Sequence, residues 1–303
     1  MKPGHRKAGW TNAVPCLLTV GAMWLAGNTW AAVDDSAGLA LLAQHTQLAG
    51  QLQHNPFGRP LVLFSSEGAS GLTGDIYAVM AYPLSTVSTS LKSADKWCEV
   101  MILHINTKYC HATDGPQSST LRVHMGKKTP QSLADATRMD FRYSEVAASA
   151  NYFAVALSAE DGPLGTSDYR IGLQAVALPG NKTFLHLGYS YGMGFAGRMA
   201  MQTYLATVGA DKVGFTQIRK RRDGQFQWVD GVLGVVERNA MRYFLAIDSV
   251  LAAQSLPPAQ QFEARLQGWF TAVERYPRQL HEMDRPAYLE MKRAEHTRQQ
   301  TLL

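Results

Sequence analysis

The stretch GDIYAVMAYPLSTVSTSLKSADKWCEVM, residues 74–101, decides the fold, because its hydrophobic pattern changes period at Pro83. Before Pro83, residues 76, 78 and 80 (Ile, Ala, Met) alternate with residues 75, 77 and 79 (Asp, Tyr, Val). This alternation predicts a half-buried strand over Thr73–Tyr82. Proline suits the first turn of a helix, so Pro83 is expected to end that strand and open a helix over Leu84–Leu91. A second short helix is predicted over Ala94–Met101.

Strand-like segments dominate the chain on both sides of this stretch. A helix over Ser36–Gln53 and a strand over Leu61–Glu67 precede it. Short turns separate several of the later segments, which is typical of antiparallel neighbours. The later strands are expected over Leu103–Cys110, Ser119–Met125, Arg138–Ser149, Tyr152–Ala159, Ser167–Leu178 and Thr183–Tyr191.

The C-terminal part changes to helices after one more hairpin. Residues 213–229 predict a hairpin with Asp223-Gly224 at its tip. A long helix is expected over Val232–Ala253, and a charged helical segment over Gln260–Gln300. This order predicts an α+β fold in which a curved antiparallel sheet wraps around the long helix and encloses an apolar interior.

The N-terminal residues predict a secretory signal peptide over residues 1–32. Three basic residues precede the apolar run Ala13–Ala26, and cleavage is expected near Ala31 or Ala32. A membrane span needs about 20 apolar residues, so an uncleaved anchor is the weaker alternative. The mature chain is expected to be periplasmic or secreted. Cleavage leaves 26 basic against 24 acidic residues, a balance that does not imply nucleic-acid binding.

Cleavage would also remove Cys16 and leave Cys98 and Cys110. An even pair of cysteines in an exported chain predicts a disulfide between them. Two buried free thiols are the alternative.

Two short motifs suggest enzymatic chemistry. Gly192, Gly194 and Gly197 match the spacing G-x-G-x-x-G, but a dinucleotide site also needs a second parallel strand before an acidic residue, and none precedes Asp211. Turn formation and close packing explain the glycines better. Ser190 in GYSYG matches the G-x-S-x-G of a nucleophile elbow, although the following helix starts several residues late.

The stretch 74–101 and a second stretch, DGVLGVVERNAMRYFLAI at 230–247, resemble the START-type, helix-grip (SRPBCC) superfamily of lipid and hydrophobic-ligand carriers. The first looks like that family's strand, proline-initiated helix and tryptophan-bearing helix, and the second like the start of its long helix. The chain departs from the family in its signal peptide, in the helical segment 192–208 and after Pro257. The expected domains are a signal peptide (1–32), a START-like domain (33–255) and a C-terminal helical extension (256–303).

The resemblance implies binding or transfer of a lipid or other hydrophobic ligand in an internal cavity, without catalysis and without a cofactor. No histidine shows the spacing of metal ligands, so no metal site is expected. Arginines four residues apart on the long helix would bind a ligand carboxylate or phosphate if they face inward; pairing with an acidic residue or solvent is the alternative. The expected cavity residues are Val79, Met80, Leu121, Phe141, Tyr143, Phe153, Val176, Arg238, Met241, Arg242 and Leu245.

Other functions remain open. An exported serine ester hydrolase would use Ser190, with Asp230 or Asp248 and His281 completing a formal triad. The apolar stripe of the extension predicts either a packed helix or a partner site. The basic hairpin tip, Arg219, Lys220, Arg221 and Arg222, is either a solvated turn or a contact with anionic membrane lipids.

Overall fold

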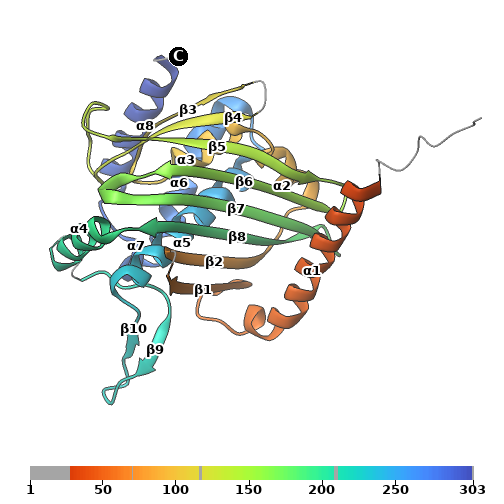
Figure 1. Cartoon of the computed structure of the whole chain (residues 1–303), viewed down its shortest axis with the longest axis horizontal. Helices are drawn as coiled ribbons and strands as arrows, with labels where there is room; N and C mark the ends of the chain where they lie inside the picture. Colours follow the sequence, from red (N-terminus) through yellow and green to blue (C-terminus); the bar gives the residue numbers. More distant parts are fainter. Residues whose placement is uncertain (1–27, 70, 116–117, 208–210, 302–303) are drawn as a thin grey trace, which may run out of the picture.

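The computed structural model describes residues 28–69, 71–115, 118–207 and 211–301 (Figure 1). They form one large sheet, a small hairpin and several helices. The strands are β1 (Leu61–Gly68), β2 (Gly71–Met80), β3 (Thr107–Thr113), β4 (Ser119–Met125), β5 (Thr137–Ala148), β6 (Tyr152–Asp161), β7 (Thr166–Leu178), β8 (Lys182–Met193), β9 (Gln217–Lys220) and β10 (Phe226–Trp228). The helices are α1 (Asn28–Gln53), α2 (Leu84–Leu91), α3 (Ala94–Met101), η1 (Pro163–Gly165, a 3₁₀ turn), α4 (Phe195–Ala206), α5 (Gly231–Ala253), α6 (Pro258–Val273), α7 (Pro277–Leu280) and α8 (Arg285–Thr301).

The large sheet has the strand order β1-β2-β8-β7-β6-β5-β4-β3, and all neighbours are antiparallel. From β3 to β8 each strand pairs with the next along the chain. Strand β2 pairs with β8 instead, with Met80 opposite Thr183. The α+β class is confirmed, and this sheet lacks the parallel strand–helix–strand unit that a dinucleotide site would need.

Helix α5 lies at the centre of the molecule. On its sheet side, a Cβ atom at Gly74 of β2 would lie 3.2 Å from the Cβ of Ala240, so the missing side chain lets the helix approach the strand closely. Every residue from Ala240 to Ile247 is buried. A helix that is buried all round must be covered on the side away from the sheet as well.

The C-terminal helices provide that cover. Helix α6 packs along α5, and α8 packs against α6 and β3 (Figure 1). Trp269 of α6 stacks on Tyr288 of α8 at 4.9 Å between ring centroids, and both side chains belong to the main hydrophobic core. The segment expected as an extension over 256–303 therefore shares the core of the preceding domain.

Helix α1 covers the opposite face of the sheet (Figure 1). Its leucines Leu41, Leu48 and Leu52 form a second hydrophobic cluster with side chains from the sheet. Val79 and Val176 pack in this second cluster, so the prediction that they face the interior is wrong. Both faces of the sheet carry apolar side chains here, and alternation alone does not tell which set faces α5.

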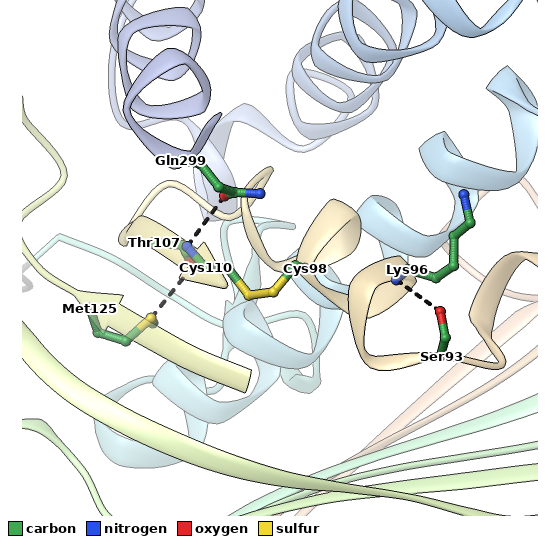
Figure 2. Close-up of a disulfide and its surroundings, with 7 residues drawn as sticks. All are labelled: Ser93, Lys96, Cys98, Thr107, Cys110, Met125 and Gln299. Atoms are coloured by element: carbon green, nitrogen blue, oxygen red, sulfur yellow. Dashed lines mark hydrogen bonds between the residues drawn. A yellow bond between two sulfur atoms is a disulfide. The ribbon is translucent and has the colours of Figure 1, made fainter. Parts of the chain in front are cut away.

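A disulfide joins Cys98 of α3 to Cys110 of β3, with their Cα atoms 5.3 Å apart (Figure 2). The predicted pairing is confirmed. Ser93 caps α3 by accepting a hydrogen bond from the backbone N–H of Lys96. Gln299 of α8 accepts a hydrogen bond of 3.3 Å from the backbone N–H of Cys110, so the bridge lies where α3, β3 and α8 meet (Figure 2).

Most of the predicted signal peptide lies outside the described residues. Residues 28–32 form the first residues of α1, and the cleavage position stays a prediction. Of the helices in the described ranges, none is both long and apolar enough to cross a bilayer.

Candidate ligand-binding site

Five tyrosines line the space between the sheet and α5; we call them the tyrosine wall. They are Tyr143 of β5, Tyr169 of β7, Tyr189 and Tyr191 of β8, and Tyr243 of α5, and all are buried. Tyr169 stacks on Tyr191 with 5.2 Å between ring centroids, and Tyr189 lies 5.4 Å from Tyr243. Residues 189 and 191 share one face because side chains alternate along a strand. The interior is therefore aromatic and carries several hydroxyl groups.

The hydroxyls of the tyrosine wall differ in their hydrogen bonding. The hydroxyl of Tyr143 donates to the carbonyl oxygen of Leu91 at 3.3 Å, and that of Tyr169 bonds to Thr166 Oγ1 at 2.8 Å. The buried hydroxyl of Tyr191 has no hydrogen-bond partner within the described residues. Burial raises the pKa of Tyr191, so this hydroxyl stays protonated and able to donate. A polar atom of a bound ligand would remove the cost of leaving it unpaired.

The structure places several predicted cavity residues at this interior. Five that lie on strands belong to the core cluster, namely Met80, Leu121, Phe141, Tyr143 and Phe153. Met241 and Leu245 belong to the same cluster, but Leu245 is turned away from the sheet because it lies five residues beyond Ala240 on the helix. A role of these residues in ligand binding stays a prediction.

The two arginines of α5 do not face the tyrosine wall. They lie two residues before and after Ala240, which places them on the opposite side of the helix. Arg238 donates to the carbonyl oxygen of Val213 at 3.1 Å, and Arg242 donates to Glu282 at 2.6 Å. Their prediction as residues of the cavity between sheet and helix is wrong in position, because the segment before β9 covers Arg238 and the C-terminal segment covers Arg242.

Glu237 anchors the base of the β9–β10 hairpin. Its buried carboxylate accepts hydrogen bonds from Ser65 Oγ at 2.7 Å, from Thr216 Oγ1 at 2.6 Å, and from the backbone N–H groups of Phe215 and Thr216. Four donors satisfy the carboxylate, so it holds β1, α5 and the hairpin together.

Ser190 is not part of a nucleophile elbow. It lies inside β8, opposite Thr73, and the helix that follows begins only at Phe195. The neighbouring Tyr189 and Tyr191 face α5, so Ser190 points to the other face of the sheet. His281, the formal triad partner, bonds to Glu274 at 3.0 Å on the α5 side. The structure does not bring the predicted triad together.

The glycine motif has a packing role. Gly192 lies at the end of β8, opposite Ser167 in the antiparallel sheet, and α4 follows. A Cβ atom at Gly197 would lie 2.7 Å from the carbonyl oxygen of Gly165, so this glycine lets α4 pack on η1. Close backbone packing, part of the preferred explanation of the motif, is thus confirmed at Gly197, whereas a Cβ atom at Gly194 would meet no atom within 4 Å.

The basic hairpin projects from the body of the molecule (Figure 1). Strands β9 and β10 pair as predicted, and Gly224 has a φ of +81°, which suits the turn at the tip. The four basic side chains at residues 219–222 are exposed. Ile218 is 55% exposed and Phe226 is 40% exposed on the same hairpin, so cationic and apolar groups share one projecting element.

A groove of about 660 Å³ lies outside the sheet, between the end of α1, the start of β1 and the β7–β8 turn. Leu52, Val79 and Leu178 contribute apolar surface to it, and Arg59 and Lys182 contribute positive charge. Val79, expected in the interior, thus lines an outer groove. A smaller groove of about 250 Å³ adjoins the segment after α1 and reaches Phe215.

A buried ion cluster fixes α8 to β3, and no sequence pattern indicated it. Lys292 donates to the carbonyl oxygens of His104 and Thr107, each at 2.7 Å, and to Glu295 at 2.8 Å. Lys108 of β3 donates to the same carboxylate at 3.0 Å. Burial lowers the pKa of Lys292 to about 8, against the opposing effect of Glu295. Over the parts of the chain that the structure describes, no group of three or more histidine, cysteine, aspartate or glutamate residues could hold a metal ion.

No protein-family model and no curated protein matches the chain. Solved structures do match. A conserved protein from Geobacillus kaustophilus matches 59% of this chain and 95% of its own, with 12% identity and a TM-score of 0.35. Human StAR-related lipid transfer protein 5 matches 58% of this chain and 90% of its own, with 11% identity and a TM-score of 0.31. The Zhui aromatase/cyclase from Streptomyces sp. R1128 matches 67% of this chain and 93% of its own, with 11% identity and a TM-score of 0.30.

The fold itself follows from the strand order, the register and the position of α5 described above. Several of the solved structures that this chain resembles are helix-grip proteins of the START and aromatase/cyclase type, and the likeness is one of fold.

Proposed function

We propose that this chain binds a hydrophobic ligand against the tyrosine wall, between the sheet and α5, and that it does so outside the cytoplasm. The unpartnered hydroxyl of Tyr191 carries the proposal, because it is a buried donor within an otherwise apolar and aromatic interior. A ligand with a mainly hydrocarbon body and one acceptor oxygen would fit this chemistry. The name of the human transfer protein, with its reference to lipid, agrees with such a ligand.

A ligand between the sheet and α5 needs space that side chains of the interior now occupy. The two grooves described above lie along α1 and not between the sheet and α5. Binding is therefore expected to shift the tyrosine wall or the elements that cover it. A change in near-ultraviolet circular dichroism on ligand addition would report that shift.

Native mass spectrometry with lipid extraction, on the chain purified from an exporting host, tests this function first. A stoichiometric lipid or other hydrophobic molecule is the expected result. The Tyr191→Phe variant should retain less of it, whereas Tyr143→Phe, which removes a hydroxyl that already has a partner, should retain as much as the parent chain. Absence of ligand in all three proteins, together with no binding of a neutral fluorescent hydrophobic probe, would contradict the proposal.

The basic hairpin is proposed to contact anionic membranes during uptake or delivery of the ligand. Exposed Ile218 and Phe226 would enter the interface while residues 219–222 pair with lipid phosphates. Each basic residue near an anionic surface contributes about 1 kcal/mol. Flotation with vesicles of phosphatidylcholine, with and without phosphatidylglycerol, tests this contact.

A charge-matched pair of variants makes the flotation experiment specific. R221E/R222E reverses two charges on the hairpin, and K92E/R170E reverses two exposed charges elsewhere. Only the hairpin variant should lose binding to the anionic vesicles. Equal loss in both variants would show a general effect of net charge and not a contact through the hairpin.

A further inference from the structure

Three cationic side chains converge on one carboxylate on the side of α5 that is turned away from the sheet. Arg242 of α5 lies 2.6 Å from Glu282, Lys128 of the β4–β5 connection lies 2.7 Å from it, and Lys212, which precedes β9, lies 3.9 Å from it. We call Arg242, Lys128 and Lys212 the cation cluster. The three residues come from three distant parts of the chain, and the fold alone brings them together.

The cation cluster has a buried floor and an accessible rim. The side chains of Arg242 and Glu282 are 4% and 8% exposed, whereas those of Lys128 and Lys212 are 21% and 23% exposed. An anion from solvent can therefore reach the two lysines first and the arginine after them. Arginine suits the floor of such a site, because its planar guanidinium binds carboxylates and phosphates through two parallel hydrogen bonds.

Glu282 is the carboxylate that all three cations of the cluster share. Another acid of the C-terminal segment, Glu274, bonds to His281. Its carboxylate therefore pairs with a residue outside the cation cluster. Burial raises the pKa of Glu282, but Arg242 and Lys128 lower it more, and the net pKa lies below its usual range. The pKa of Lys212 is lowered, first by burial and then by Lys128 and the arginines, although Glu282 opposes this. An anion that takes the place of Glu282 would be stabilised by the same three cations.

Glu282 is carried by a short irregular connection between α7 and α8. His281 precedes Glu282 in this connection, and its carbonyl oxygen accepts a hydrogen bond from Lys212. The same lysine therefore contacts both the backbone of the connection and the carboxylate of Glu282. The connection can shift without breaking either helix, because its residues belong to neither.

We propose that the cation cluster is a binding site for a carboxylate or phosphate group, and that Glu282 is its internal occupant. An incoming anion displaces Glu282 from Arg242, and the 281–284 connection moves toward solvent. This site is separate from the tyrosine wall, on the other side of α5, so it does not depend on the proposed function.

Substitution of Glu282 tests this site with two probes, inorganic phosphate and dodecyl phosphate, measured by calorimetry on the full mature chain. Glu282→Gln keeps the size of the side chain and removes the competing charge, so it should bind at least one probe about tenfold more tightly than the parent chain. Glu263→Gln is the matched control, because it removes a carboxylate that pairs with Arg293 at 2.6 Å on the exposed surface of the same segment. It should bind like the parent chain.

The two probes separate the possible sources of the anion. Tighter binding of both indicates a site for a free anion, and tighter binding of dodecyl phosphate alone indicates a lipid head group; both results support the site. If Glu282→Gln folds poorly, phosphate should raise its melting temperature more than it raises that of the parent chain, and Arg242→Met in the same background should remove the effect. Equal response of E282Q, E263Q and the parent chain to both probes would overturn the proposal.

Discussion

The indole Nε1 of Trp269 donates a hydrogen bond of 3.1 Å to the carbonyl oxygen of Arg242. This bond joins α6 to the middle of α5, and the ring of Trp269 is stacked on Tyr288 of α8. The C-terminal helices are thus tied to the central helix by a buried donor and by aromatic contact. A chain that ends at Pro257 would leave this side of α5 open to water.

Trp269→Ala should lower the free energy of unfolding by about 3–5 kcal/mol, the usual cost of removing a large buried aromatic side chain. A chain that ends at Pro257 should be aggregated or poorly folded in gel filtration and circular dichroism. A truncated chain that stays monomeric and cooperative would show that residues 33–255 form an independent domain, as the sequence predicts.

Gly74→Ala should destabilise the fold by about 1–3 kcal/mol, because the new Cβ would press on Ala240 and on the carbonyl oxygen of Val236. Gly172→Ala is the matched control. It also lies in a strand of the sheet, but no atom lies within 4 Å of its added Cβ, so its effect should be small. Urea unfolding of the two variants measures the difference. Similar losses in both would mean that strand glycines act through flexibility and not through contact with α5.

Tyr191→Phe should leave the free energy of unfolding of the ligand-free chain unchanged or raise it by up to about 1 kcal/mol, since it removes an unpaired buried hydroxyl. Tyr143→Phe should lower that energy by about 1 kcal/mol, because it removes a hydrogen bond to Leu91. Each substitution removes one hydroxyl oxygen from the tyrosine wall. The difference between the melting temperatures of the two variants therefore reports the effect of the hydrogen-bond partner. A loss in Tyr191→Phe equal to that in Tyr143→Phe would indicate that the Tyr191 hydroxyl is satisfied in solution.

The lowered pKa of Lys292 predicts that the free energy of unfolding rises at alkaline pH. Folding lowers its pKa from 10.5 to about 8, so between these values the unfolded chain binds more protons and the free energy of unfolding rises with pH. The difference between the parent chain and Lys292→Met should therefore grow by about 2 kcal/mol from pH 7.5 to 9.5. Urea unfolding of both proteins at several pH values measures this difference. Taking the difference removes the contributions of titrating groups that both proteins share. A constant difference across this range would mean that Lys292 titrates normally.

The disulfide should contribute about 3 kcal/mol to stability by closing a short loop in the unfolded chain. Cys98→Ala with Cys110→Ala should lower the urea midpoint accordingly, and a reducing agent should have little further effect on that variant. The parent chain, by contrast, should lose stability on reduction. An unchanged midpoint in the double variant would show that packing of α3 on β3 suffices without the bond.

The local sequence predicted the elements well because local rules govern them. Pro83 at the start of α2, the Asp223-Gly224 turn and the alternation in β2 each act over a few residues, and the structure contains all three elements. The disulfide was also predictable, since only two cysteines remain after the expected cleavage. An even pair of cysteines in a chain expected to be exported sufficed for this prediction, without knowledge of the fold.

The site was harder to predict because it depends on which faces are covered. Val79 and Val176 were assigned to the wrong face, since α1 makes the outer face of the sheet apolar as well. Arg242 was expected at a cavity because the sequence does not show that α6–α8 fold back over α5. Buried charges such as Lys292 and Glu282 escaped notice for the same reason: each looks like a surface residue until a distant partner is placed beside it.

The strand order also has a consequence for how the molecule folds. Strands β3 to β8 meet neighbours that are close in the sequence, and such contacts close small loops with little entropy cost. The seam between β2 and β8 joins Met80 to Thr183 and cannot form until the intervening meander has collapsed. Folding is therefore expected to run from the meander toward this seam, with the docking of β1 and β2 as the slow step. Substitutions in the seam should accelerate unfolding, and those in the meander should slow folding.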